Sequence, residues 1–291
     1  MKLNPRFKNS FLPLIVAVVV LIILTIVFYL EVLGLNALPF TKENLNTTIN
    51  PVDVGIGMLI YLKTSIDFAL FIGMLMKKYP GVKNRYAIEI GTGLGNMLGT
   101  ALVLGLWTLF KEISILLGIM VLLASLVLFE MANASLEHLF ESNHNEVSND
   151  HVEVKNWQRR IARSIKLLIS PILFFITPIL SRIMPSMSQK PDTEPKSWWS
   201  LFFLSLSVPF ILGLDDFAGY VPFFKVVNVF GFGIGVFVGH CLLNILLFLN
   251  PTLTIKAIKN PIVAILGALA FIFLGLYGLY EAIHIILETL H

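Results

Sequence analysis

Long apolar runs separated by short polar connections dominate the chain. A helix needs about 20 apolar residues to cross the hydrocarbon core of a bilayer, and seven runs meet that length, near 11–34, 54–76, 86–109, 113–135, 200–222, 226–249 and 261–287. The run at 11–34 is longer than the apolar region of a signal peptide, and no Ala-x-Ala-like cleavage site follows it. The pattern therefore predicts an all-α, polytopic membrane helix bundle that retains its leading helix.

An eighth segment, residues 164–184, is long enough to cross but carries Pro171 and Pro178. It fits a transmembrane helix, a broken helix or a helix lying in the interface. We take the basic N-terminus, residues 1–10, as cytoplasmic in a plasma membrane. The distribution of Lys and Arg then favours seven crossings, whereas hydrophobic length favours eight, so both topologies stay open.

Residues 136–163 form the one long polar stretch, and they divide the chain into two parts. Acidic residues fill its first half and basic residues its second, and we expect a cytoplasmic loop. Around it we expect a leading transmembrane helix, two three-helix repeats and the segment discussed above, at 11–34, 52–135, 198–287 and 164–184.

The two parts repeat each other. "SIDFALFIG" at 65–73 parallels "LDDFAGYVP" at 214–222, which places Asp67 opposite Asp216, each followed by Phe-Ala. The next helix of each part has the spacing Gly-x-Gly-x-Gly-x-x-x-Gly, in "GTGLGNMLG" and "GFGIGVFVG". Repeats of this kind occur in secondary transporters. They are inverted if segment 164–184 does not cross the membrane, and parallel if it does.

Composition limits the class of protein. The chain has 291 residues, of which 56% are hydrophobic and 13% charged, with a mean hydropathy of +0.83. These values are typical of a membrane protein whose partner is the lipid bilayer. The net charge of +3 gives no reason to expect nucleic acid. With one cysteine and no hydrolytic motif, the sequence points to neither a disulfide, a bound cofactor nor an enzyme.

Three aspartates lie inside apolar runs: Asp67, Asp215 and Asp216. An aspartate near the bilayer centre costs about 2.5–3.5 kcal/mol, so such residues usually face the bundle interior or a watery cavity. Lys63 lies one turn before Asp67, close enough to pair with it. The adjacent second-half carboxylates repel each other, and a cation or a proton would relieve that repulsion. We therefore expect an ion-binding site here, with Asp67 and Asp216 as candidate metal ligands.

Polar and small residues follow the two glycine-rich helices. Glu89, Thr92, Asn96 and Thr100 share one face of the first, and His240 and Asn244 lie one turn apart on the second. Either interhelical hydrogen bonds or the wall of an ion pathway would explain them. The glycines form stripes that let helices approach closely, at Gly91, Gly95, Gly99, Gly231, Gly235 and Gly239.

With an intramembrane aspartate motif in the first helix of each repeat, "TSIDFALFIG" and "LGLDDFAGYV", each followed by a glycine-rich helix, the chain resembles the lysine exporter (LysE) superfamily. The resemblance is to the cadmium-resistance, tellurite-resistance and manganese-exporter-like branches. It implies efflux or exchange of a cation or small solute, with Asp67 and Asp216 lining a central site. Phe68 and Phe217 stand where several branches have Asn or a second Asp.

The sequence thus favours an integral membrane secondary transporter for a cation, such as a divalent metal ion, or for a small solute. The oxygen-rich side chains favour Mn²⁺ or Ca²⁺ over Cd²⁺. The alternative is a membrane protein that binds a partner or assists assembly through residues 137–163. Either function is compatible with a homodimer.

Overall fold

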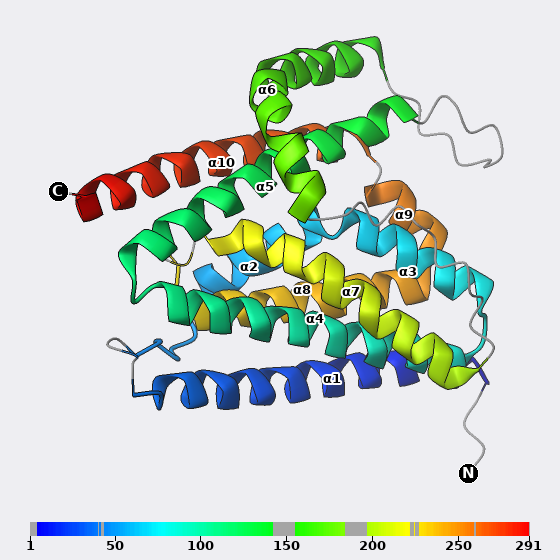
Figure 1. Ribbon diagram of the computed structural model, residues 1–291. Coiled ribbons are helices and arrows are strands. Elements are labelled where there is room, and N and C mark those ends of the chain that lie inside the picture. The colour runs from blue at the N-terminus through cyan, green and yellow to red at the C-terminus, as the bar shows by residue number, and fades with distance from the viewer. Residues whose placement is uncertain are drawn as a thin grey trace. The chain divides into compact units, whose positions relative to one another are not determined.

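The computed structural model describes residues 5–39, 41, 44–141, 155–183, 197–221, 224, 227–258 and 260–290. Within them, side chains are described except at 5–13, 63, 66, 67, 70, 138–141, 175–183, 211–220, 251, 255 and 258. No β-strand occurs in this part of the chain. Its helices are α1 Pro5–Asn36, α2 Pro51–Thr64, α3 Ile66–Lys78, α4 Val82–Phe110, α5 Ser114–Glu141, α6 Asn156–Ile183, α7 Trp198–Tyr220, α8 Val229–Leu249, α9 Pro251–Ile258 and α10 Pro261–Leu290 (Figure 1).

Five helices of the described chain are long and apolar enough to cross a membrane. They are α4, α8 and α10, together with Leu14–Asn36 of α1 and Ser114–Glu137 of α5. Shorter apolar helical stretches occupy Pro51–Leu62 of α2 and Trp198–Phe210 of α7. The prediction of an all-helical, multi-pass membrane protein is therefore confirmed at this level.

The prediction of a single helix at 54–76 is wrong, because the structure has two helices there, α2 and α3. Ser65 separates them with φ −80° and ψ 32°. The Tyr61 carbonyl oxygen accepts both the Ser65 N–H at 2.9 Å and the Thr64 hydroxyl at 3.2 Å. Serine and threonine side chains compete in this way for backbone groups and weaken helices locally.

The loop predicted at 136–163 is too long at both ends. α5 continues to Glu141, and α6 begins at Asn156, eight residues before the predicted start of the 164–184 segment. The Lys155 N–H donates to Gln158 Oε1 at 2.8 Å, which caps the start of α6. Lys166 of α6 then pairs with Glu137 of α5 at 3.0 Å. These side-chain contacts explain why polar residues here are helical.

The chain forms two compact units. The first comprises Met1–Ile113 and Pro195–Ile255, with α1 to α4, α7 and α8, and the second comprises Ser114–Glu194 and Lys256–His291, with α5, α6 and α10. In the second unit, Phe129 of α5 packs over Gly275 of α10, and Gly118 of α5 lies under Ile286. The buried α6 residues Ala162, Ile165, Ile169 and Leu173 complete the apolar core of that unit.

Glycines bring helices of the first unit into backbone contact. A Cβ added at Gly95 of α4 would overlap the Leu206 carbonyl oxygen of α7, and one at Gly91 would lie 2.6 Å from the Phe202 oxygen. Gly235 of α8 likewise lies directly against the Val54 carbonyl of α2. The pairs α4–α7 and α2–α8 therefore depend on residues without side chains.

Contacts along these helices also fix their directions. The start of α8 lies beside the start of α2, since Gly231 contacts Asp53, so these two helices are parallel. α4 and α7 are parallel by the glycine contacts above. α4 and α8 are antiparallel, because Arg85 near the start of α4 donates to the Phe248 carbonyl near the end of α8, at 3.3 Å.

α1 packs along α8 and α4. The Phe28 ring stacks on Phe230 with 5.5 Å between ring centroids and meets Phe237 edge-on at 5.4 Å. It also lies against Gly233, where a Cβ would collide with the ring. The other face of α1 exposes apolar side chains suited to lipid, among them Ile15, Val18, Ile22, Ile26 and Leu30.

Gly95→Ala should destabilise the protein by about 1–3 kcal/mol, because the new methyl group overlaps the α7 backbone. Gly105→Ala is the matched control on the same helix, since nothing lies within 4 Å of a Cβ there. That change should leave stability the same or raise it by up to about 1 kcal/mol. Thermal unfolding of the detergent-solubilised variants measures both. Equal melting temperatures for the Gly95→Ala and Gly105→Ala variants would contradict the close contact between Gly95 and the α7 backbone.

Candidate functional site

Six polar side chains are buried on neighbouring helices of the first unit, and we call them the polar layer; four of them, Tyr61, His240, Asn244 and Thr92, are joined by hydrogen bonds. Tyr61 comes from α2, Glu89, Thr92 and Asn96 from α4, and His240 and Asn244 from α8. The antiparallel packing of α4 on α8 brings the polar faces of the two glycine-rich helices together. Polar groups in such an apolar surrounding must find partners or remain energetically costly.

His240 is at the centre of the polar layer and is fully buried. The Asn244 amide Nδ2 lies 3.0 Å from His240 Nε2, which therefore accepts. The Nδ1 hydrogen can then be donated to the Tyr61 hydroxyl oxygen, 2.8 Å away. Both ring nitrogens are engaged by neutral partners, so the imidazole has a fixed tautomer and orientation.

The hydrogen bonds continue from α8 to α4. Asn244 Nδ2 also donates to Thr92 Oγ1 at 3.3 Å, and the Thr92 hydroxyl donates to the Glu89 carbonyl oxygen at 3.1 Å. A connected chain of polar groups thus runs from α2 through α8 to α4. It joins helices that come from both parts of the sequence.

Two atoms of the polar layer are buried without a hydrogen-bond partner: Asn96 Nδ2 and Asn244 Oδ1. The Glu89 side chain is only 5% exposed, and among the described residues no cation pairs with its carboxyl group. Leaving such groups unmatched costs about 1–3 kcal/mol each. A bound cation or a proton would satisfy the Asn244 oxygen and the Glu89 carboxyl group, and a polar solute with an acceptor atom would satisfy the Asn96 amide nitrogen.

The predicted acidic site lies at the edge of what the structure describes. The backbone of Asp67 is in the first turn of α3, directly after the Ser65 turn, and Asp215 and Asp216 are in the last turns of α7. The side chains of these aspartates and of Lys63 lie outside the described residues. Phe68, next to Asp67, is buried, and its ring centroid lies 5.5 Å from that of His240.

Sequence reasoning did not select Tyr61 or Asp53, although both are buried. Asp53 lies in the first turn of α2 and beside Gly231 at the start of α8, where helix dipoles stabilise a carboxylate. Its signal was the stretch "NPVD", which combines an N-cap residue, an N1 proline and a first-turn acid. Tyr61 has no counterpart in the repeat and no local signal.

Among the described residues, no group of three or more His, Cys, Asp and Glu side chains could hold a metal ion. Cys241 is buried, and its Sγ lies 3.5 Å from the Ala17 carbonyl oxygen on α1. The metal pair predicted at Asp67 and Asp216 lies outside the described side chains. No known family model, characterised protein or solved structure matches the chain, so the resemblance to the lysine exporter superfamily stays a prediction.

Tyr61→Phe removes the hydroxyl group that pairs with His240 and leaves the buried Nδ1 hydrogen without this partner. We expect a loss of about 1–3 kcal/mol in stability, measured by thermal unfolding in detergent. Tyr280→Phe is the control, because Tyr280 is 66% exposed, and it should shift stability by less than about 0.5 kcal/mol. Similar behaviour of the two variants would rule out an energetically important Tyr61–His240 bond.

Proposed function

We propose that the protein is a secondary transporter that moves a cation or a small polar solute across the plasma membrane. The observation that carries this proposal is the polar layer, with its unmatched amide atoms, between helices apolar enough to span a bilayer. Buried polar and ionisable groups at such a place usually belong to substrate or ion pathways. The proposal requires no catalytic step and no bound cofactor.

The chemistry of the side chains favours a hard cation as cargo or coupling ion. Oxygen donors predominate, the single imidazole is fully engaged, and the single thiol packs against α1. We propose that Asp67 and Asp216 supply the charge for a divalent metal such as Mn²⁺, and that the polar layer supplies neutral oxygens beside them. Export by exchange with protons would neutralise the same carboxylates in alternation.

The helix directions support seven crossings and inverted repeats. α7 runs parallel to α4 and therefore antiparallel to α2, the first helix of the first proposed repeat. First helices that run in opposite directions are the signature of inverted repeats. α4 and α7 begin on the same side of the bundle, so the chain between these two points crosses the membrane an even number of times. α4 and α5 account for two crossings, and α6 would then not cross. Lys and Arg then collect on that side, which we propose is cytoplasmic.

Exchanged packing gives a second argument for two repeats. The first helix of each part packs on the glycine-rich helix of the other part, α2 on α8 and α7 on α4. Val54 and Met58 of α2 meet Gly235 in the way that Leu206 and Phe210 of α7 meet Gly95. Such reciprocal contacts would follow from a pseudo-two-fold axis between the halves.

Glu89→Gln should lower cation flux roughly 10- to 100-fold in proteoliposomes, because it removes the ionisable carboxyl group from the polar layer. The measurement is uptake of Mn²⁺, Ca²⁺ and protons, followed with fluorescent reporters in the vesicle lumen. Thr92→Val should also lower flux, since it breaks the link between Asn244 and α4.

Two matched variants control for damage to the fold. Glu31→Gln changes another glutamate of a spanning helix, and Thr108→Val removes a hydroxyl that donates to the Leu104 carbonyl of its own helix. Both should transport like the wild type. Equal flux in all four variants would exclude the polar layer from the pathway. Wild-type silence across the whole panel would favour the alternative of a partner-binding protein acting through residues 137–163.

Seven crossings place Asn260 on the same side as Lys77 and opposite Ile49. Single cysteines at these positions, in a Cys241→Ala background, can be labelled with an impermeant maleimide in intact and permeabilised cells. We expect Ile49→Cys to react in intact cells, and Lys77→Cys and Asn260→Cys only after permeabilisation. Reaction of Asn260→Cys in intact cells would instead establish eight crossings and parallel repeats.

A further inference from the structure

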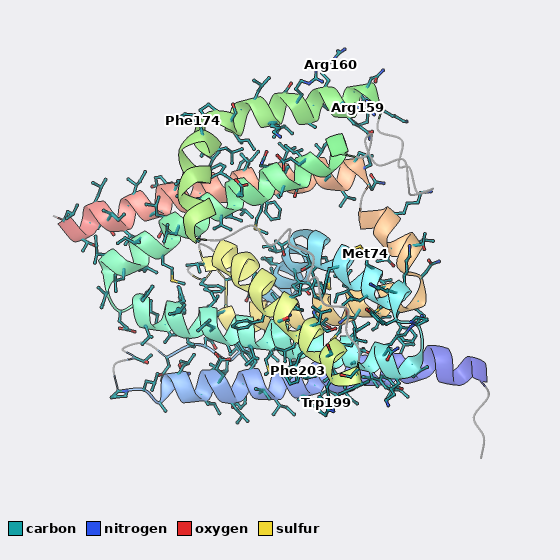
Figure 2. The ribbon with its side chains drawn as sticks, turned by 45° about the vertical axis from the view of Figure 1, so that its right-hand side comes forward. Met74, Arg159, Arg160, Phe174, Trp199 and Phe203 are labelled. Carbon is teal, nitrogen blue, oxygen red and sulfur yellow. The ribbon has the colours of Figure 1, made fainter. Side chains whose placement is uncertain are left out.

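Four aromatic rings gather on the first turns of α7, and we call them the aromatic ladder: Trp198, Trp199, Phe202 and Phe203. Trp198 and Phe202 stack with 5.7 Å between ring centroids and 10° between planes. Phe202 meets Phe203 edge-on at 5.3 Å, and Trp199 lies 6.3 Å from Phe203. Trp199 is 63% exposed and Phe203 59% exposed, and they lie close together on α7 (Figure 2).

The aromatic ladder is attached to a basic turn. Trp198 Nε1 donates to the Lys83 carbonyl oxygen at 2.9 Å, which ties the start of α7 to the start of α4. Exposed Lys77 and Lys78 lie at the end of α3, and exposed Lys83 lies in the first turn of α4, on either side of the connection between these helices. Exposed rings and exposed ammonium groups therefore occur together at one end of the first unit.

This combination matches the chemistry of an anionic phospholipid. Tryptophan is enriched where helices leave the hydrocarbon core, because its ring is apolar and its N–H is polar. Lysines at the same level attract anionic headgroups. A zwitterionic lipid would satisfy the rings but not the lysine charges, and a cationic partner would be repelled.

We propose that the aromatic ladder and the lysines of the α3–α4 turn form a binding surface for an anionic phospholipid. Its acyl chains lie on Trp199 and Phe203, and its phosphate contacts Lys83 and Lys77. Because the Trp198–Lys83 bond joins α7 to α4, a lipid bound here stabilises the same helix pair that meets at Gly91 and Gly95. This surface is independent of the polar layer and of the proposed transport.

Quenching of tryptophan fluorescence by brominated lipids tests the proposal on the full chain. The protein carries Trp157→Phe, so that Trp198 and Trp199 report on the surface, while Trp107 is 7% exposed and adds a constant signal. Brominated phosphatidylglycerol and brominated phosphatidylcholine are compared in mixed vesicles. We expect phosphatidylglycerol to be preferred about fivefold for each contributing lysine, and the preference to fall as salt is raised.

Lys77→Gln with Lys83→Gln should bring the preference close to one while leaving quenching by phosphatidylcholine unchanged. Arg160→Gln with Arg163→Gln removes the same charge from α6 in the second unit and should leave the preference intact. An equal fall in both double variants would mean a general charge effect and would overturn the proposal. Absence of quenching by both brominated lipids would also overturn it, because the surface would then face protein rather than lipid.

Discussion

The close approach of backbones at the glycines is the constraint on which the first unit depends. At Gly95 and Gly235 no atom beyond hydrogen fits on the α-carbon, because a carbonyl oxygen of the neighbouring helix occupies that space. Apolar burial gives little drive between helices in lipid, so dispersion contacts over such smooth surfaces carry much of the association. The side chains that make a helix apolar must then lie on its other faces.

This arrangement determines where polar residues can be placed. On α4 the glycine face meets α7, so the polar face that includes Thr92 meets α8 instead. On α8 the glycines meet α2, and His240 and Asn244 are left to meet α4. The short interhelical distance lets Tyr61 reach His240 from a third helix. A connected polar layer is thus a consequence of tight packing. Packing alone does not require the unmatched atoms, Asn96 Nδ2 and Asn244 Oδ1.

The sequence predicted much of this, and its failures have physical causes. The lengths of the apolar runs located the helices. The regular spacing of the glycines located the helix faces that pack. The Ser65 turn was missed because a few polar residues barely lower the hydropathy of a long window, although the Thr64 hydroxyl there competes for the Tyr61 carbonyl. Tyr61 itself was missed because only tertiary packing brings it to His240. The helical ends at 136–141 and 156–163 were missed because their support comes from contacts across two helices, such as Lys166 with Glu137.

The two proposed repeats differ in a way that bears on the acidic site. Val54 and Leu206 occupy equivalent places against the glycines, yet the first half has three residues more between that place and its aspartate than the second half has. Three residues are close to one helical turn, a rise of about 5 Å, and the Ser65 turn falls within that interval. The first half therefore reaches its aspartate only after a break between α2 and α3, whereas Asp216 lies within the continuous helix α7. Because these aspartates follow unlike backbone segments, the two halves would not contribute symmetrically to the acidic site that we propose.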